Sequence, residues 1–295
     1  MTAPFGTLLT AMVTPFTADG ALDLDAAARL ATNLVDAGND GLVISGTTGE
    51  SPTTSDEEQD RLLRAVVEAV GDRAHIVAGV GTNDTAHTVE LARHAEKAGA
   101  AAVLVVTPYY SKPPQAGLLA HFTTVADATE LPSMLYDIPG RSGVPIATET
   151  ILRLAEHPRV VAVKDAKGDL PASTEVIAKT DLAYYSGDDV LNLPLLAVGA
   201  VGMVSVASHV CSPQLVALVA AVGRGDLSEA RRLNAEVWPA ILGIMTRTQG
   251  AIMAKAALEL LGVLANRTTR QPLIDATPEQ VELLRSDLRA AGLDL

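Results

Sequence analysis

The stretch TLLTAMVTPFTADGALDLDAAARLATNLVDAGNDGLVIS, residues 7–45, decides the fold. It begins and ends with a short apolar run that is too brief for a helix. Between them lies an amphipathic, Ala-rich segment that starts after Asp23 and ends at Gly38, and these residue types favour the two ends of a helix. The stretch therefore predicts a strand–helix–strand unit of a parallel sheet.

The same pattern continues for more than two hundred residues. Further signals agree with it, since Ser55 and Glu58 predict a capping box and Asp84 precedes a helix that ends at Gly99. An open doubly wound sheet would usually have fewer strands and a phosphate-binding glycine fingerprint, and GVGTND from Gly79 lacks the third glycine. We expect an α/β fold, a (β/α)8 TIM barrel. Its eight strands are TLLTAMV from Thr7, GLVIS from Gly41, HIVAGV from His75, AVLVV from Ala102, SMLYD from Ser133, VVAVK from Val160, LAYYS from Leu182 and VGMVSV from Val201.

The alternation stops at about Asp226. Three helical patterns follow, over residues 227–246, 249–261 and 278–291. The chain has no internal repeat, low-complexity tract or linker. We therefore expect residues 1–225 to form the barrel, and residues 226–295 to form a C-terminal three-helix extension packed on it.

Composition excludes several classes of protein. The chain has 295 residues, enough for one large core, and its 22 Lys and Arg against 35 Asp and Glu argue against a nucleic-acid partner. The longest apolar run, LVALVAAV from Leu215, is far shorter than the ~20 residues that span a bilayer, and the first residues do not resemble an export signal. A single cysteine, Cys211, fits a reducing compartment. We expect a cytoplasmic protein with no membrane partner.

Lys164 ends the sixth predicted strand, and a barrel carries its active site at the carboxyl ends of its strands. The period of two places Lys164 on the face of Ala162, opposite Val161 and Val163. If the valines pack against helices, Lys164 points into the barrel. A buried ammonium without a partner tends to lose its proton, and the amine can then attack a ketone. A lysine that extends to solvent is the alternative.

Other polar residues follow strand ends. By the same parity Tyr136 faces inward, where its phenol could relay protons, although it could instead only cap the core. Thr47 and Thr48 lie in a glycine-bounded turn whose backbone N–H groups could approach a carboxylate, but these are also ordinary turn residues. Arg141, after Tyr136, could bind a second carboxylate or remain solvated. The six histidines show no HExxH pair, so we expect no metal site.

Two pairs account for four of the five tyrosines. Tyr109 and Tyr110 follow the fourth predicted strand, and rings in such a position often reach across a subunit contact. Tyr184 and Tyr185 fall within the seventh predicted strand, where we expect them to pack in the core.

Taken together, GTTGES, TPYY, YDIPGRSG, VVAVKDAKGD and SGDD, in this order at strand ends, closely resemble the dihydrodipicolinate synthase and N-acetylneuraminate lyase superfamily. The resemblance runs from about Thr7 to the C-terminal helices. It implies a pyruvate-dependent lyase of the class I aldolase type, in which Lys164 forms a covalent imine with pyruvate. It implies no metal and no organic cofactor.

The resemblance also implies roles for the other candidates. Tyr136 protonates and deprotonates the reacting centres, and Thr47 links it to Tyr110 of the partner subunit. The backbone N–H groups of Thr47 and Thr48 hold the pyruvate carboxylate. Carbonyl groups near two further residues line the same pocket: Gly187 and Val204. A homo-oligomer follows, expected to be a tetramer made of two tight dimers.

Arg141 separates the members of the superfamily. In the synthases an arginine here binds the carboxylate of aspartate semialdehyde, so the implied reaction joins pyruvate to that aldehyde in the diaminopimelate and lysine pathway. The first alternative is a sister aldolase or dehydratase acting on a 2-keto-3-deoxy sugar acid or a related 2-oxo acid, against which the Arg141 loop and residues 205–209 argue. The second is a barrel that has lost catalysis and only binds, against which the retained candidate residues argue.

One departure concerns regulation by lysine. Relatives inhibited by lysine bind it in a cleft at the tight dimer interface. At the matching positions this chain keeps Ser51, Asn83 and Tyr109, but has Gln59 where a histidine, and His87 where a glutamate, commonly lies. Because the lost carboxylate would have paired with the ligand's ammonium group, we expect weak or absent inhibition by lysine.

Overall fold

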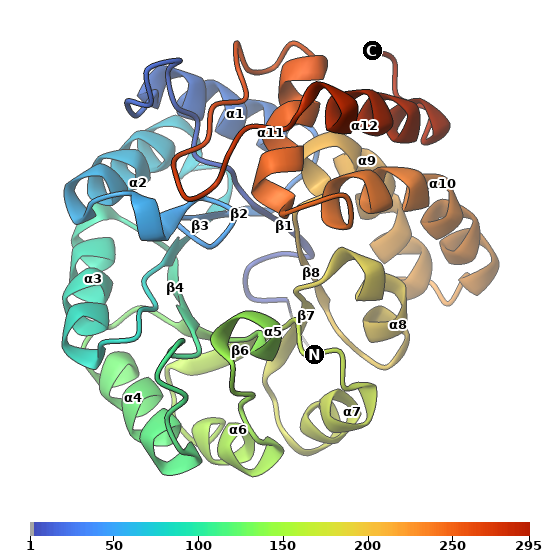
Figure 1. Ribbon diagram of the computed structural model, residues 1–295. Helices are drawn as coiled ribbons and strands as arrows, with labels where there is room; N and C mark the ends of the chain where they lie inside the picture. Colours follow the sequence, from blue (N-terminus) through green and yellow to red (C-terminus); the bar gives the residue numbers. More distant parts are fainter. Residues whose placement is uncertain (1–2) are drawn as a thin grey trace.

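A computed structural model describes residues 3–295. Eight parallel strands form a closed barrel in which each strand is hydrogen-bonded to its neighbours in chain order (Figure 1). All eight predicted strands are confirmed, and so is the TIM-barrel fold. The strands are β1 (Leu8–Ala11), β2 (Gly41–Ile44), β3 (His75–Gly79), β4 (Ala102–Val106), β5 (Ser133–Asp137), β6 (Val160–Asp165), β7 (Ala183–Ser186) and β8 (Gly202–Ser205).

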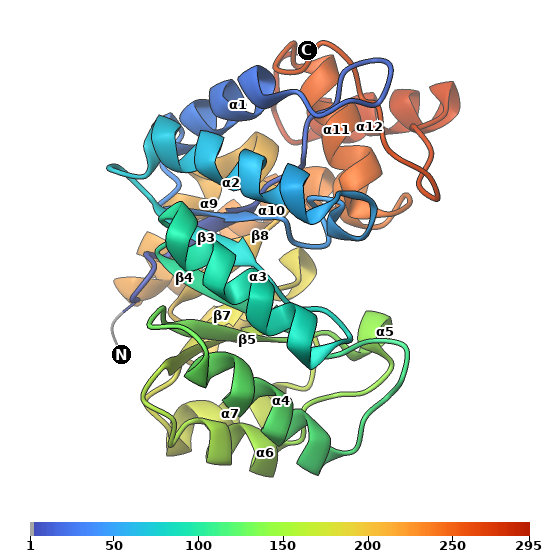
Figure 2. The same ribbon diagram turned by 90° about the vertical axis from the view of Figure 1, so that its left-hand side faces the viewer.

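Helices surround the barrel on its outside (Figures 1 and 2). The predicted caps are present: the Asp23 and Asp84 side chains accept hydrogen bonds from the first turns of α1 and α3, and Ser55 and Glu58 form the capping box of α2. The helices of the barrel are α1 (Leu24–Asp36), α2 (Asp56–Val70), α3 (Thr85–Ala98), α4 (Gln115–Asp127), α5 (Pro139–Ser142), α6 (Thr148–Leu154), α7 (Leu170–Lys179), α8 (Asn192–Ala197) and α9 (Ser208–Gly223), with the 3-10 turns η1 (Ser51–Thr53) and η2 (Asp189–Leu191).

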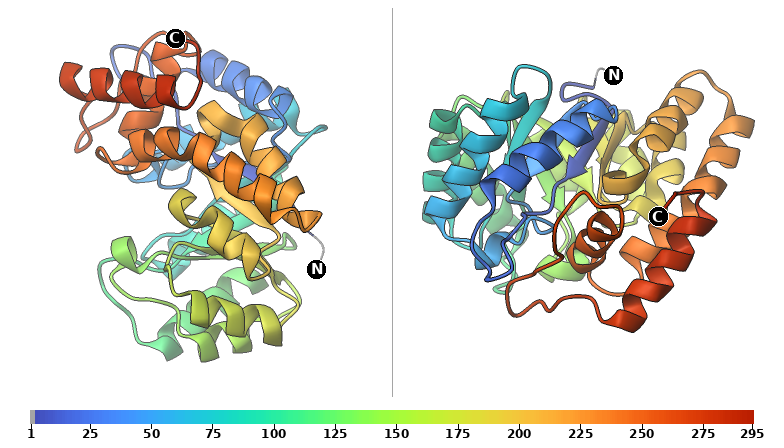
Figure 3. Two further views of the ribbon diagram at one scale, coloured as in Figure 1. Left: turned by 90° about the vertical axis from the view of Figure 1, so that its right-hand side faces the viewer. Right: turned by 90° about the horizontal axis from the view of Figure 1, so that it is seen from above.

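Three more helices form the C-terminal extension, α10 (Leu227–Met245), α11 (Gly250–Leu260) and α12 (Pro278–Ala290). α10 packs against α9 and α12, and α11 contacts α9, α10 and α12. In Figures 1 and 3 the extension, orange to red, covers one side of the barrel near α1 and α9. α11 is buried along most of its length, from Gly250 to Leu258. No helix within residues 3–295 is both long and apolar enough to cross a membrane.

The register of the strands decides which side chains face inward. Tyr136 of β5 pairs with Lys164 of β6, which pairs with Tyr185 of β7, so these three side chains share one face. The next residue of β6, Asp165, faces outward, where it accepts a hydrogen bond from Ser173 of α7 at 2.6 Å. Lys164 and Tyr136 therefore lie inside the barrel, as the period of two predicts.

Tyr184 and Tyr185 are both buried, which confirms that they pack in the core. Tyr185 donates its hydroxyl to the Gly6 carbonyl at 3.0 Å. Tyr184 donates to Asp165 on the outer face of the sheet.

Candidate active site

A cavity of about 520 Å³ opens at the carboxyl ends of β2 to β5. Ligand sites of barrel enzymes lie at this end. The lining comes from four segments: Ser45, Gly46, Thr47, Ser51 and Pro52 after β2, Gly79 and Gly81 at β3, Leu104, Val106, Tyr109 and Tyr110 at β4, and Tyr136, Ile138, Arg141 and Ser142 at β5. Four candidates named from the sequence meet here: Thr47, Tyr110, Tyr136 and Arg141.

Lys164 lies beside this lining and is only 5% exposed. Its Nζ is 4.2 Å from the centroid of the Tyr136 ring. The pKa of Lys164 is lowered to about 7, chiefly by burial; the charge of Asp189 opposes this shift and the charge of Arg141 contributes to it. A large fraction of Lys164 is therefore an uncharged amine at neutral pH, the form that attacks a carbonyl group.

The Tyr136 ring that lies against this amine carries a phenol. The pKa of Tyr136 is raised to about 12, chiefly by burial; the charge of Arg141 and the hydrogen bond with Thr47 oppose this shift, and the charge of Asp188 contributes to it. The phenol is therefore protonated at neutral pH. It can donate a hydrogen bond or a proton to an oxygen that develops on a substrate bound at Lys164.

Arg141 lies in the short helix α5, which stands at the mouth of the barrel (Figures 1 and 2). The loop that carries it is closed by Asp137, whose carboxylate accepts the Ile146 N–H at 3.1 Å. Lys167 of the next loop pairs with the same carboxylate at 3.3 Å. Arg141 is exposed on this held loop, so its guanidinium can receive an anionic group from solvent.

The turn that carries Thr47 and Thr48 has free donors. Within residues 3–295 the backbone N–H groups of Thr47 and Thr48 donate no hydrogen bond. The turn itself is fixed, because Thr14 donates its hydroxyl to the Gly49 carbonyl at 2.6 Å and the Glu50 N–H donates to the Thr47 carbonyl at 3.1 Å. Two free N–H groups on a fixed turn beside Tyr136 can bind a carboxylate.

Residues 4–291 match the model of the dihydrodipicolinate synthetase family. The chain belongs to this family. It is 69% identical over 290 residues to 4-hydroxy-tetrahydrodipicolinate synthase of Kineococcus radiotolerans, covering 98% of this chain and 94% of the relative. It is 64% identical to 4-hydroxy-tetrahydrodipicolinate synthase 2 of Streptomyces coelicolor, covering 99% and 97%.

Solved structures of the family have the same fold. A dihydrodipicolinate synthase from Bacillus anthracis is 42% identical with a TM-score of 0.93, covering 97% of this chain and 98% of that one. A second, from Cyanidioschyzon merolae with lysine bound, is 41% identical with a TM-score of 0.96, covering 99% and 100%.

The remaining predicted site residues lie outside this lining, except Tyr110. Gly187 follows β7 and lies against Lys164, so that a Cβ built there would be 2.8 Å from the lysine Cγ. Val204 of β8 and Thr48 are both buried, and neither these two residues nor Gly187 is part of the cavity lining. Tyr110 is 90% exposed and has a φ of 73°, a left-handed conformation that is uncommon for a residue with a side chain.

Sequence reasoning missed the part played by Asp189. Its buried carboxylate accepts the N–H groups of Val206 and Ala207 at 2.8 and 2.9 Å, and it also accepts from Asn192 at 2.9 Å. It thereby joins the loops after β7 and β8 and places a negative charge near Lys164. The SGDD motif shows two acids at a strand end, but only the folded chain shows that Asp189 binds the loop after β8.

Within the part of the chain that the structure describes, no group of three or more His, Cys, Asp or Glu side chains could hold a metal ion.

Proposed function

We propose that this chain is a Schiff-base-forming lyase that condenses pyruvate with L-aspartate 4-semialdehyde to give 4-hydroxy-tetrahydrodipicolinate in the diaminopimelate and lysine pathway. The observation that carries the proposal is the Lys164 amine, buried in the barrel 4.2 Å from the centroid of the Tyr136 ring, with a pKa lowered to about 7. The names of the similar proteins from Kineococcus radiotolerans and Streptomyces coelicolor agree with it.

The reaction begins when the neutral amine of Lys164 attacks the carbonyl carbon of pyruvate. Tyr136 protonates the hydroxyl group of the resulting carbinolamine, which leaves as water and gives an imine. Loss of a proton from the methyl carbon gives an enamine, and this carbon attacks the aldehyde carbon of the semialdehyde. The amino group of the semialdehyde then attacks the imine carbon, closing the ring and releasing Lys164. No metal or organic cofactor takes part.

Two groups hold the two carboxylates. The free N–H groups of Thr47 and Thr48 bind the carboxylate of pyruvate, and Arg141 binds that of the semialdehyde. Tyr136 serves the reacting centres, with its hydroxyl linked through Thr47 to Tyr110 of the partner subunit. Carbonyl groups near Gly187 and Val204 complete the pocket around the imine.

The assembly that we propose is a homotetramer made of two tight dimers, in the cytoplasm. The exposed Tyr110 ring supports a dimer, because a subunit contact would cover it and bring it to the neighbouring site. The family also contains a protein described as the first monomeric dihydrodipicolinate synthase variant, 37% identical with a TM-score of 0.95 and covering 99% of this chain and 98% of that one. Sedimentation of the purified protein, together with the activity of Tyr110→Phe, tests this assembly.

Trapping of the imine tests the chemistry. The protein is incubated with pyruvate, reduced with sodium borohydride, digested and examined by mass spectrometry. We expect one reduced pyruvate adduct, on Lys164, and none in Lys164→Ala. A protein that gains no adduct would refute the proposed chemistry.

A further inference from the structure

A buried acid follows the carboxylate-binding turn directly. Glu50 lies two residues after Thr48 and is 2% exposed. Its φ of 55° is left-handed, an uncommon conformation for a residue with a side chain, so its surroundings must stabilise it. The mechanism above does not use this carboxylate.

The partner of Glu50 comes from the C-terminal extension. Lys255 of α11 is buried as well, at 1% exposed, and donates its Nζ to Oε1 of Glu50 and to the Thr268 carbonyl, the latter at 2.8 Å. The two residues are 205 positions apart in the chain. The other oxygen, Oε2 of Glu50, accepts the backbone N–H of Arg270 at 2.9 Å. Both oxygens of this carboxylate are thus held by the extension.

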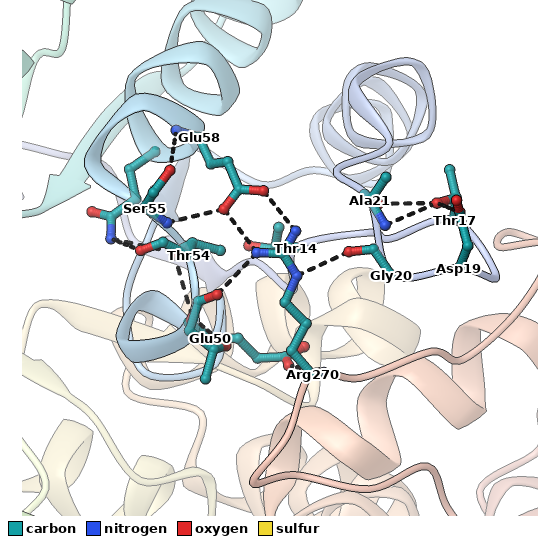
Figure 4. A network of polar contacts seen from close by, with 12 residues as sticks. Thr14, Thr17, Asp19, Gly20, Ala21, Glu50, Thr54, Ser55, Glu58 and Arg270 are labelled. Carbon is teal, nitrogen blue, oxygen red and sulfur yellow. Dashed lines mark hydrogen bonds and ion pairs between the residues drawn. The ribbon is translucent and has the colours of Figure 1, made fainter.

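Arg270 makes a second connection to the same segment, seen from close by in Figure 4. Its guanidinium binds Glu58 of α2 through two nitrogens, at 2.6 and 2.7 Å. It also donates to the carbonyl groups of Thr53 and Gly20, each at 2.9 Å. The cations of Lys255 and Arg270 lie 4.1 and 4.3 Å from the centroid of the Phe16 ring. The extension therefore holds the segment after β2 at Glu50, at Thr53 and at Glu58.

The position of Glu50 is transmitted to the turn through the backbone. The Glu50 N–H donates to the Thr47 carbonyl at 3.1 Å, and the Ser51 N–H donates to the Gly46 carbonyl at 3.3 Å. A shift of Glu50 would therefore move the two N–H groups at Thr47 and Thr48, and the Thr47 hydroxyl with them. Buried ion pairs are weak evidence for stability, since apolar residues of similar volume can replace them at no cost. We therefore interpret the Glu50–Lys255 ion pair as a contact that sets the geometry of the turn.

We propose that Glu50, Lys255 and Arg270 are positioning residues, through which the C-terminal extension holds the Thr47–Thr48 turn in the shape that binds the carboxylate of pyruvate. The inference rests on the proposed function, because it assigns the turn to pyruvate. The network does not include the loop of Arg141, which is fixed by Asp137 and Lys167. Loss of the network of Glu50, Lys255 and Arg270 should therefore weaken the binding of pyruvate and leave the binding of the semialdehyde unchanged.

The test measures the two substrates separately in Glu50→Gln and Arg270→Lys. We expect the pyruvate concentration for half-maximal borohydride trapping, and the KM for pyruvate, to rise roughly 10- to 100-fold in Glu50→Gln, the size of effect seen when groups that support metal ligands are removed. Arg270→Lys keeps the positive charge but loses the two-nitrogen contact with Glu58, so we expect a smaller rise in both pyruvate constants. The KM for aspartate semialdehyde should change less than about twofold in both, whereas simple unfolding would lower activity without separating the two constants.

Two further variants complete the design. Asp287→Asn removes the ion pair of Asp287 with Arg247, 2.9 Å long, which lies within the extension and does not touch the turn, and we expect both KM values to be unchanged. Glu50→Gln/Lys255→Met removes both buried charges and keeps the volume, so it should fold even if the single variant does not. A selective rise in the pyruvate constants of this double variant supports the proposal.

The outcomes also separate this inference from the proposed function. If the unaltered protein forms no adduct with pyruvate, the proposed function fails. If it forms the adduct, and the folded Glu50 variants have the pyruvate constants of the unaltered protein, the positioning role alone is overturned.

Discussion

Replacement of Gly187 by alanine would place a methyl group against Lys164, the proposed nucleophile. The new Cβ would lie 2.8 Å from Cγ and 3.1 Å from Cε of Lys164, and 3.0 Å from the carbonyl oxygen of Asp165. The backbone of Gly187 is fixed, because its N–H donates to that carbonyl at 2.7 Å. Carbon atoms pack best at about 3.5–4.0 Å, so the Lys164 side chain must move by roughly 0.7 Å or more.

A displacement of about 1 Å in a reacting group can lower a rate about 10²-fold. We therefore expect Gly187→Ala to form the pyruvate imine roughly 10- to 100-fold more slowly than the unaltered protein, with its fold intact. The assay is a time course of borohydride trapping at saturating pyruvate. The matched control is Gly223→Ala in α9, where the new Cβ would meet no atom within 4 Å and the rate should not change. An unaltered rate in Gly187→Ala would refute the close contact on which the reasoning depends.

Four further predictions concern the Lys164 amine, the Tyr136 phenol and regulation by lysine. Because the pKa of Lys164 is lowered to about 7, the rate of imine formation should rise with pH and level off above about 7, and a rate already level at pH 5 would contradict this. The unfolded chain, in which a lysine has a pKa of 10.5, then binds more protons than the folded one between pH 7 and 10.5, so the free energy of unfolding should rise over this range and Lys164→Met should abolish that part of the rise in denaturant titrations. Tyr136→Phe should lower kcat by about 10²- to 10⁴-fold while pyruvate still protects the protein from unfolding, whereas loss of protection would indicate a damaged pocket. Inhibition by lysine should be weak or absent, since Gln59 donates to the Ser51 and Thr54 carbonyls and His87 hydrogen-bonds Asp56, and an inhibition constant in the micromolar range would contradict this.

Local patterns predicted the barrel because each of its strands can be recognised from a short apolar run of residues. The period of two placed Lys164 and Tyr136 on one face, and the register of β5 and β6 then paired them. Capping signals at Asp23, Ser55 and Asp84 located the starts of three helices, because a cap is a contact between near neighbours in sequence.

Contacts between distant residues could not be predicted in this way. The pair of Glu50 and Lys255 joins the loop after β2 to α11, and neither residue stands out in its own segment. Asp189 likewise shows its role only when the loop after β8 donates to it. The sequence predicted the groups that we propose react with the substrate, and the fold was needed to find the groups that hold them in place.

The most direct test of the proposed function is the consumption of aspartate semialdehyde by the purified protein in the presence of pyruvate, followed through a coupled NADPH-dependent reductase. We expect rapid turnover that depends on both substrates and vanishes in Lys164→Ala. No turnover, despite a pyruvate adduct trapped on Lys164, would contradict the synthase assignment and indicate an aldolase of another 2-oxo acid.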